Sequence, residues 1–308
     1  MGNRYIRFDW AAKTILRDKA NFCILEGLVT VLLGEEVHIL ELLESESNQS
    51  YAEDKFNRVD IKARNSKDEI IIVEIQQTRE LHYLERILYG VAKTLTEHIH
   101  LGDKYDNVKK VYSINILYFD LGTGDDYIYH GQTHFVGLNK KDVLRVTTKE
   151  ADLIKLRTPE EIFPEYFLIR VNAFNKIAEN HLEEWMRYFK DGDIDENTTA
   201  PGLQEAKRKL EYINMTKAEK HAYDEHINAI MIQNDVISTS RLEGLAEGRA
   251  EGRAEGRAEG RAEGIAIGEQ KGRAEGIASI ARTMKSSGVA IDQIAKFTGL
   301  SESEITDL

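Results

Sequence analysis

The sequence predicts an α/β fold in which a mixed sheet is flanked by helices and followed by a helical C-terminal extension. Two strongly apolar, strand-like segments at 70–76 and 111–119 stand between segments with helical periodicity. The predicted order is helix, three strands, helix and two more strands, and this alternation favours an α/β sandwich. From residue 244 the composition changes to a glycine-containing repeat, which marks the extension.

Hydrophobic periodicity places the individual elements. Apolar residues recur at three- and four-residue steps between Asp9 and Leu33, which predicts a helix, and Gly34 stands where a helix commonly ends. The predicted elements before the repeats are helices at 9–33, 80–99, 160–173, 178–190 and 203–240, and strands at 37–43, 58–63, 70–76, 111–119 and 127–136. The strands at 58–63 and 70–76 are separated by a polar turn and predict a hairpin.

Two carboxylates and one amide stand out in this hairpin. Asp60 lies in the first strand, and Glu74 and Gln76 lie two residues apart in the second, so their side chains point to the same face. Val73 and Ile75 flank Glu74, and a carboxylate in such apolar surroundings is costly to bury unless a partner neutralises it. Because a second carboxylate comes from the neighbouring strand, the pattern predicts a divalent metal site for phosphodiester hydrolysis.

This spacing resembles the signature of the PD-(D/E)XK nuclease superfamily, which has an Asp on one strand and Glu-x-Lys on the next. Gln76 stands where that signature has lysine, and the form Asp…Glu-x-Gln is similar to the branch known as the Rpn family, or PD-(D/E)XK family transposases. The resemblance runs from about Phe8 to Asn175 and implies a restriction-endonuclease-like core.

The resemblance also implies roles for the residues of the hairpin. Asp60 and Glu74 would hold Mg²⁺ or another divalent cation, and the backbone carbonyl of Ile75 would complete the site. Gln76 would orient the attacking water by a hydrogen bond, but it carries no charge with which to stabilise the transition state. A degenerate, inactive version of the site is the competing interpretation.

Two further residues are candidates for the catalytic site. Glu26 interrupts the apolar first helix, and relatives often place a Glu of this helix near the metal, although a surface-facing Glu is an equal alternative. Lys62 lies two residues after Asp60 and shares its face, so it is the better substitute for the missing lysine, with Gln77 as the second choice.

The helix after the hairpin offers a DNA contact. Arg86 and Tyr89 lie one turn apart and resemble the Arg-x-x-Tyr of the family, which implies that Arg86 contacts phosphate. A surface ion pair for Arg86 and simple core packing for Tyr89 are the alternatives.

Composition limits the classes of function and location. The formal net charge of −12 over 308 residues argues against broad electrostatic attraction to DNA, so only a local cleft would be basic. The single cysteine, Cys23, lies in an apolar helical stretch and fits a reducing compartment. With no long apolar segment and no apolar signal region, the sequence predicts a cytoplasmic protein without membrane contact.

The repeats have glycine at every fourth residue between 244 and 276, mostly with Arg-Ala-Glu in between. Ala, Glu and Arg favour a helix, but each glycine costs about 1 kcal/mol relative to alanine, and like charges four residues apart repel each other. An isolated helix would therefore be marginal. One interpretation is self-association through 241–276, where the four-residue period favours right-handed winding; the other is a length-variable spacer.

The last residues predict a small helical tail. Short helices are expected at 277–285 and 291–297, and Ser301 with Glu304 forms a capping-box pattern before a final helix. The tail resembles the helix-turn-helix-like tail of the family, and such helices read DNA in other proteins. Because the last helix carries Glu302, Glu304 and Asp307 and no arginine, protein contact is the alternative. The predicted domains are a nuclease-like domain at 1–190, a helical linker region at 191–240, the repeat at 241–276 and the tail at 277–308.

Two functional hypotheses follow. By resemblance the chain is a Mg²⁺-dependent DNA endonuclease that hydrolyses phosphodiester bonds and promotes recombination or accompanies mobile elements. The alternative is a catalytically weak or inactive nuclease fold that acts as an oligomeric interaction protein, in a mobile-element or phage-defence setting.

Overall fold

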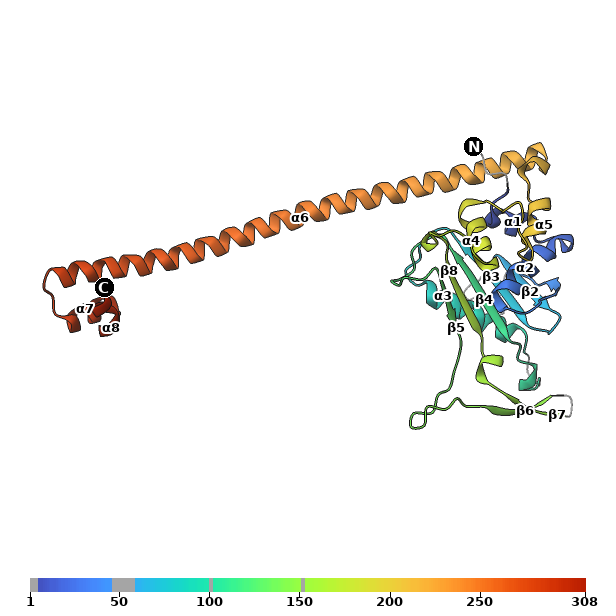
Figure 1. Cartoon of the computed structure of the whole chain (residues 1–308), viewed down its shortest axis with the longest axis horizontal. Helices are drawn as coiled ribbons and strands as arrows, with labels where there is room; N and C mark the ends of the chain where they lie inside the picture. The colour runs from blue at the N-terminus through green and yellow to red at the C-terminus, as the bar shows by residue number, and fades with distance from the viewer. Residues whose placement is uncertain (1–4, 46–58, 100–101, 151–152) are drawn as a thin grey trace. The chain divides into compact units, whose positions relative to one another are not determined.

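The computed structural model describes residues 5–45, 59–99, 102–150 and 153–308. The chain divides into two units, Met1–Ile230 and Met231–Leu308. The first unit contains a six-stranded sheet with its helices, and the second contains helices alone (Figure 1).

The six-stranded sheet is mixed. Its strands are β1 (Ile39–Leu42), β2 (Ile61–Asn65), β3 (Ile70–Gln76), β4 (Val111–Leu117), β5 (Ile128–Gly131) and β8 (Glu165–Arg170). They lie in the order β1-β2-β3-β4-β8-β5. The pairs β3–β4 and β4–β8 are parallel, and the other pairs are antiparallel. The predicted fold class, a mixed sheet flanked by helices with a helical C-terminal extension, is confirmed.

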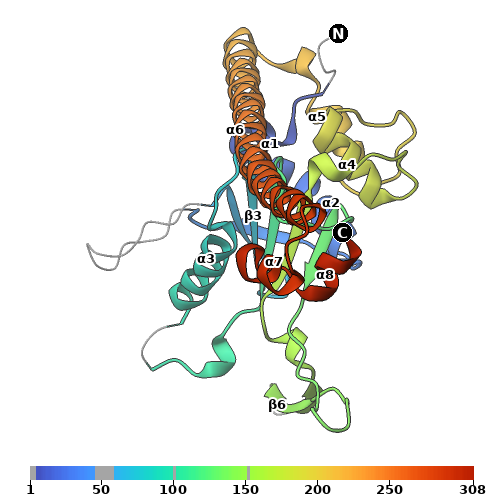
Figure 2. The same cartoon turned by 90° about the vertical axis from the view of Figure 1, so that its left-hand side faces the viewer.

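Helices cover both faces of this sheet (Figure 2). The helices of the first face are α1 (Phe8–Thr14), α2 (Phe22–Leu33), α4 (His181–Asp191) and α5 (Leu203–Lys209), and α3 (Tyr83–Glu97) covers the second. Ile71, Val73 and Ile75 of β3 belong to the core of the first face, whereas Ile70 and Ile72 pack with Val91 of α3. Because side chains alternate along a strand, Glu74 and Gln76 share the α3 face.

A close backbone approach joins α2 to the segment before α5. A Cβ atom added at Gly27 would overlap the backbone of Pro201 and Gly202. Gly202 itself has a φ of +78°, which favours glycine. These two glycines therefore allow α5 to pack against the first face of the sheet.

The predicted hairpin forms from β2 and β3. The strand predicted at 70–76 has those bounds, and the antiparallel register pairs Ile61 with Val73. Asp60 immediately precedes β2 and so lies beside Glu74 at the end of the ladder. Of the strand predicted at 58–63, Arg58 lies outside the described residues.

The single helix predicted at 9–33 is wrong. It is interrupted after α1 by the short 3₁₀ helix η1 (Lys19–Asn21). The Asp18 side chain accepts the N–H of Ala20 at 2.9 Å, and Asn21 Nδ2 donates to the carbonyl of Ile15 at 2.9 Å. These local side-chain bonds compete with helical backbone bonds and let the chain turn between α1 and α2.

The helix predicted at 160–173 is also wrong, because this segment contains β8 between the 3₁₀ helices η3 (Pro159–Glu161) and η4 (Val171–Ala173). β8 pairs with β4 on one side and β5 on the other. Its residues, Glu-Tyr-Phe-Leu-Ile-Arg, include aromatic and β-branched types that suit strands, and the place beside the fully buried β4 decides the outcome.

The helix predicted at 203–240 is divided. After α5 comes the 3₁₀ helix η5 (Tyr212–Asn214), and α6 (Lys217–Ser286) then begins. Thr216 and Glu219 form a reciprocal cap, with N–H···O distances of 2.7 and 3.3 Å. Residues of the predicted linker region, including Ile194, Leu203 and Tyr223, pack into the main core, and the division between the units lies at 230–231.

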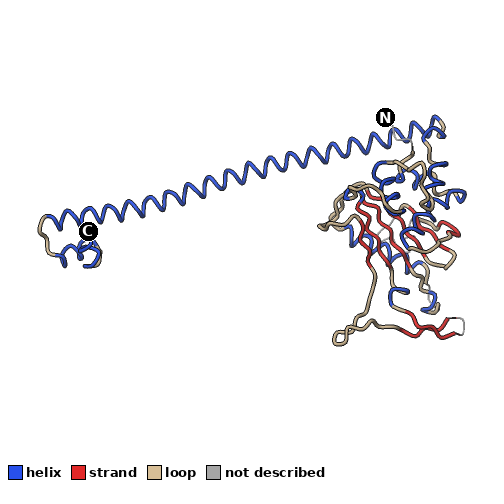
Figure 3. The backbone as a smooth tube through the Cα atoms, viewed as in Figure 1, coloured by secondary structure: helices blue, strands red, loops and turns tan. Residues whose placement is uncertain are grey.

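A second, two-stranded sheet was not predicted. β6 (Val146–Glu150) and β7 (Leu153–Arg157) pair antiparallel between β5 and β8 in the chain, and the 3₁₀ helix η2 (Tyr105–Asn107) precedes β4. Figure 3 shows this pair of strands apart from the six-stranded sheet.

In the second unit α6 runs without a break through all the repeats (Figure 3). Two short helices follow, α7 (Ile291–Thr298) and α8 (Glu302–Asp307), and Ala281, Ile294 and Ile305 form a small core between them and the end of α6. The predicted capping box at Ser301 is confirmed. Within the described ranges, none of the helices combines the length and apolar character needed to cross a bilayer.

Candidate active site

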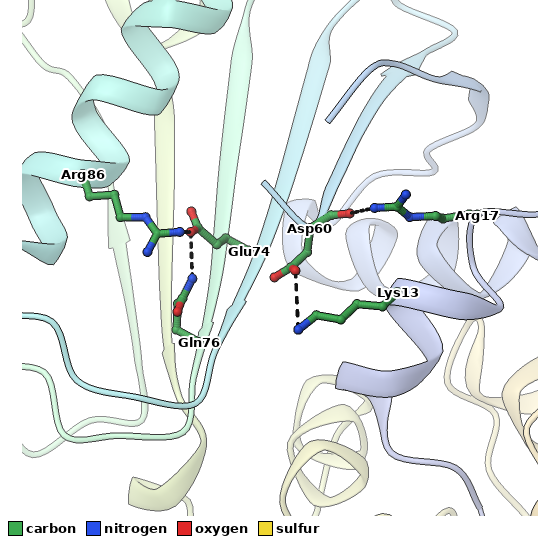
Figure 4. A pocket seen from close by; sticks show the side chains of 6 residues that line it. All are labelled: Lys13, Arg17, Asp60, Glu74, Gln76 and Arg86. Carbon is green, nitrogen blue, oxygen red and sulfur yellow. Dashed lines mark hydrogen bonds and ion pairs between the residues drawn. The ribbon is translucent and has the colours of Figure 1, made fainter. Parts of the chain in front are cut away.

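A pocket of about 450 Å³ lies where the end of β3 meets α1 and α3 (Figure 4). It is lined by Lys13, Arg17, Asp60, Glu74, Gln76 and Arg86. The two predicted metal ligands and the predicted water-orienting amide are therefore brought together in one place.

Asp60 is held by the backbone of the next strand. Its Oδ2 accepts the N–H of Ile75 at 2.7 Å, and its Oδ1 lies 3.8 Å from Lys13 Nζ. The ladder of β2 and β3 begins only at Ile61, so the Asp60 carboxylate takes the place of a ladder partner for Ile75. The N–H and C=O of one strand residue point toward the same neighbouring strand. The Ile75 carbonyl therefore points toward the β2 side of β3, where Asp60 lies.

Glu74 is a buried carboxylate with two donors on one oxygen. Its exposed fraction is 5%. Gln76 Nε2 donates to Oε1 at 2.9 Å, and Arg86 pairs with the same atom. Burial raises the pKa of Glu74 above its ordinary value, while the charge of Arg86 and the bond from Gln76 oppose that shift. The group therefore gains from any further cation that reaches it.

The donor atoms at the pocket fit a hard divalent cation. Two carboxylates and a backbone carbonyl are oxygen ligands of the kind that Mg²⁺ prefers, and Mg²⁺ keeps several waters. Within the described part of the chain, no group of three or more His, Cys, Asp or Glu side chains is arranged to hold a metal. Asp60, Glu74 and the Ile75 carbonyl would thus share the ion with water, which is how sites for Mg²⁺ are commonly built.

The charge of the pocket differs from that of the chain. Among the residues that the structure describes, its lining contains three cations, Lys13, Arg17 and Arg86, against two carboxylates, although the chain as a whole carries −12. With both carboxylates neutralised by a divalent ion, the three cations would face an incoming phosphate. The pocket is therefore locally more basic than the chain as a whole, as a site for an anionic ligand requires.

The structure places two predicted catalytic residues outside the pocket. Glu26 Oε1 accepts the N–H of Ile39 at 2.7 Å and so ties α2 to β1. Lys62 lies on the α3 face of the sheet, where its Nζ is 2.5 Å from Glu97 Oε2 at the end of α3, and only 5% of the residue is exposed. Neither side chain lines the pocket.

Of the predicted Arg-x-x-Tyr pair, one residue lines the pocket and the other does not. Arg86 lines the pocket and pairs with both Glu74 and Glu80. Tyr89 lies one turn further along α3, is 36% exposed and is not part of the lining.

Lys13 and Arg17 are pocket residues that the sequence did not reveal. Arg17 Nη2 donates to the carbonyl of Asp60 at 3.4 Å, across 43 residues of sequence. Lys13 lies in α1, and Arg17 follows the end of that helix at Thr14, and nothing in the sequence connects either cation to Asp60.

The comparisons with known proteins agree with this fold. The model of the PD-(D/E)XK nuclease family transposase matches residues 6–240. The model of the Rpn/YhgA-like nuclease family C-terminal HTH domain matches residues 275–308. No curated protein and no solved structure matches the chain. Since the first match spans well over half of the sequence, the chain belongs to the PD-(D/E)XK nuclease family transposases.

Proposed function

We propose that this protein is a Mg²⁺-dependent endodeoxyribonuclease that hydrolyses phosphodiester bonds. The observation that carries the proposal is the meeting of Asp60 and Glu74 in one pocket, where the other charged residues of the described lining are the cations Lys13, Arg17 and Arg86. A bound divalent ion would polarise the phosphate and lower the pKa of the attacking water.

The residues of the pocket have different roles in this proposal. Asp60 and Glu74 would hold the ion, and the hydrogen bond from Ile75 fixes the orientation of the Asp60 carboxylate. Gln76 orients Glu74 through its bond to Oε1. Arg86 opposes the rise in the pKa of Glu74 that burial causes, and it contributes positive charge toward phosphate.

The direct test is cleavage of supercoiled plasmid DNA with Mg²⁺ by the wild type, Asp60→Ala and Glu74→Ala. Loss of cleavage in both variants is expected, while Glu36→Ala, whose side chain is 81% exposed, keeps the wild-type rate. Equal cleavage by the wild type and both site variants would remove the nuclease proposal.

The tail supports DNA as the partner, since residues 275–308 match an HTH domain of a nuclease family. Recombination or a mobile element is the setting that the family suggests, and a cytoplasmic location fits both the substrate and the single cysteine. The acidic side chains of α8, at Glu302, Glu304 and Asp307, disfavour that helix as the DNA-reading element. Contact with another protein remains the alternative role of the tail.

A second candidate function is that of an oligomeric interaction protein assembled through residues 241–276. One observation favours it: every side chain from Met231 to Gly276 is exposed along the continuous helix α6. Helical spacing of about 100° per residue puts the Gly and Ala rows on opposite sides and the Arg and Glu rows on the two flanks between them.

The positions of the Arg and Glu rows favour one orientation for a symmetric pair of α6 helices. A two-fold dimer places the same face of both helices in contact. If the helices are parallel, the Arg flank of one then meets the Glu flank of the other; if they are antiparallel, Arg meets Arg and Glu meets Glu. A second copy would therefore pair in parallel. Because a four-residue period exceeds 3.6 residues per turn, the rows wind around the helix, and the contact would extend over a few repeats.

Truncation after Ser240, followed by light scattering, tests the association. A smaller oligomer is expected, and an unchanged oligomeric state leaves the spacer interpretation. Spin labels on Arg241→Cys, with Cys23→Ser in the background, test the orientation. Parallel helices bring the two labels together, whereas antiparallel helices centred on the repeats separate them by about 50 Å.

A further inference from the structure

The pocket contains a cation, Lys13, that makes no hydrogen bond through its side chain to any residue that the structure describes. The motif position that often carries lysine is Gln76, and its amide is already committed to Glu74. Arg86 is held by Glu74 and Glu80. Lys13 differs from both, because its only ion pair within the described residues is with Asp60 Oδ1, at 3.8 Å.

A separation of 3.8 Å is an ion pair but not a hydrogen bond. The Lys13 side chain is 48% exposed, so its three donors are available to a ligand in the pocket. Arg17, in contrast, already donates to the Asp60 backbone at 3.4 Å. Of the three cations in the described lining, Lys13 is therefore the one placed to turn toward a bound water or phosphate.

The helix that carries Lys13 is fixed to the end of β3. Asp9 lies one turn before Lys13 in α1 and is fully buried, and its Oδ2 accepts bonds from Gln77 Nε2 at 2.9 Å and from His226 Nε2 at 2.9 Å. Gln77 directly follows Gln76. The backbone position of Lys13 is thereby set relative to the strand that supplies the motif.

We propose that Lys13 is the catalytic cation of this site and replaces, from α1, the charge that Gln76 lacks. The proposal rests on the proposed nuclease function. The Lys13 ammonium donates to the attacking water and to a phosphate oxygen, where negative charge grows in the transition state.

No proton is transferred to or from Lys13 in this reaction. The water oxygen forms a bond to phosphorus while one ester P–O bond breaks. The water loses a proton to solvent, and the leaving oxygen takes one from solvent. The role of Lys13 is thus electrostatic, and an arginine at the same position should retain part of it.

The test compares Lys13→Gln, Lys13→Arg and the control Lys19→Gln in the full chain. Lys19 is exposed in η1 and lies outside the pocket lining. With saturating Mg²⁺, Lys13→Gln should lower kcat for plasmid cleavage by about 10²–10³-fold with little change in KM. Lys13→Arg should recover part of the rate, and Lys19→Gln should match the wild type.

Calorimetric titration with Mn²⁺ alone provides a readout without DNA. Removing a cation from beside Asp60 should leave Mn²⁺ affinity equal or a few-fold higher in Lys13→Gln. Affinity that falls tenfold would mean that Lys13 supports the shape of the site, and a rise in KM at constant kcat would mean simple DNA attraction; either result overturns the proposal. An active wild type with an equally active Lys13→Gln rejects this inference alone, whereas an inactive wild type rejects the nuclease function and this inference with it.

Discussion

Asp60 Oδ2 accepts the backbone N–H of Ile75 at 2.7 Å. This bond connects the residue before β2 to the end of β3 and leaves Oδ1 directed toward the pocket (Figure 4). One oxygen of the carboxylate therefore maintains the geometry of the sheet edge, and the other is available to a cation. The two oxygens of Glu74 also have different contacts, since Arg86 and Gln76 both bond to Oε1.

Glu74 should give the metal-free protein a distinctive dependence of stability on pH. Its pKa in the folded state is raised, chiefly by burial, above the ordinary value of 4.5. The folded protein then binds more protons than the unfolded chain in the window above pH 4.5, so the free energy of unfolding falls as pH rises through that window. Urea unfolding in EDTA at several pH values measures this dependence. In Glu74→Gln the free energy of unfolding should fall less with pH in this window, and an identical pH dependence for both proteins would contradict the expectation.

Lys62 should prove to be a structural residue. Its pair with Glu97 has side-chain exposures of 6% and 20%, so Lys62→Met leaves a mostly buried carboxylate without its partner. We expect a loss of about 2 kcal/mol in the free energy of unfolding, below the cost of fully buried pairs because Glu97 retains some solvent.

The double variant Lys62→Met with Glu97→Leu should recover most of the stability lost in Lys62→Met, because no unpaired charge remains. Plasmid cleavage by the double variant should match the wild type. A specific loss of cleavage in a stably folded double variant would return Lys62 to the catalytic site.

Asp9 should stabilise the contact between α1 and the beginning of α6. Arg7 Nε lies 3.1 Å from its Oδ1, while Gln77 and His226 bond to Oδ2. Burial tends to raise the pKa of Asp9, but the bond from His226 and the charge of Arg7 outweigh it, and the pKa is lowered below 3.8.

The expected cost of Asp9→Asn is about 2 kcal/mol at neutral pH, since hydrogen bonds to a charged group are lost. Because the folded pKa is lowered, this stabilisation is present above pH 3.8 and is lost as pH falls through the folded value. Denaturant titrations of both proteins at several pH values measure the difference, and a cost that grows on acidification would refute the argument.

Two glycines offer a matched pair of alanine substitutions. Gly27→Ala places a Cβ atom against the backbone of Pro201 and Gly202, and it should destabilise the first unit by about 3 kcal/mol. Gly248→Ala meets no atom within 4 Å and should favour helix in α6 by about 1 kcal/mol. Thermal unfolding followed by circular dichroism tests both, and a harmless Gly27→Ala would disprove the close approach.

Local sequence determined the parts of the fold in which one strand or helix carries its own signal. β3 has the predicted bounds because an uninterrupted apolar run with β-branched residues suits a central strand. The positions of Asp60, Glu74 and Gln76 on one hairpin follow from that run and from side-chain alternation. The capping box at Ser301 formed for the same reason, since its atoms lie within one helical turn.

Only the tertiary structure decided which distant groups meet. Residues 165–170 became a strand because β4 and β5 lie on either side of them, and this neighbourhood is absent from their own sequence. Side-chain alternation places Lys62 on the α3 face of the sheet. Because it pairs there with Glu97 at the end of α3, it does not line the pocket. Lys13 lies 3.8 Å from Asp60 because Asp9 anchors α1 to Gln77, just after β3. Sequence patterns fix the direction of a side chain within its own element, whereas its partner depends on how separate elements pack.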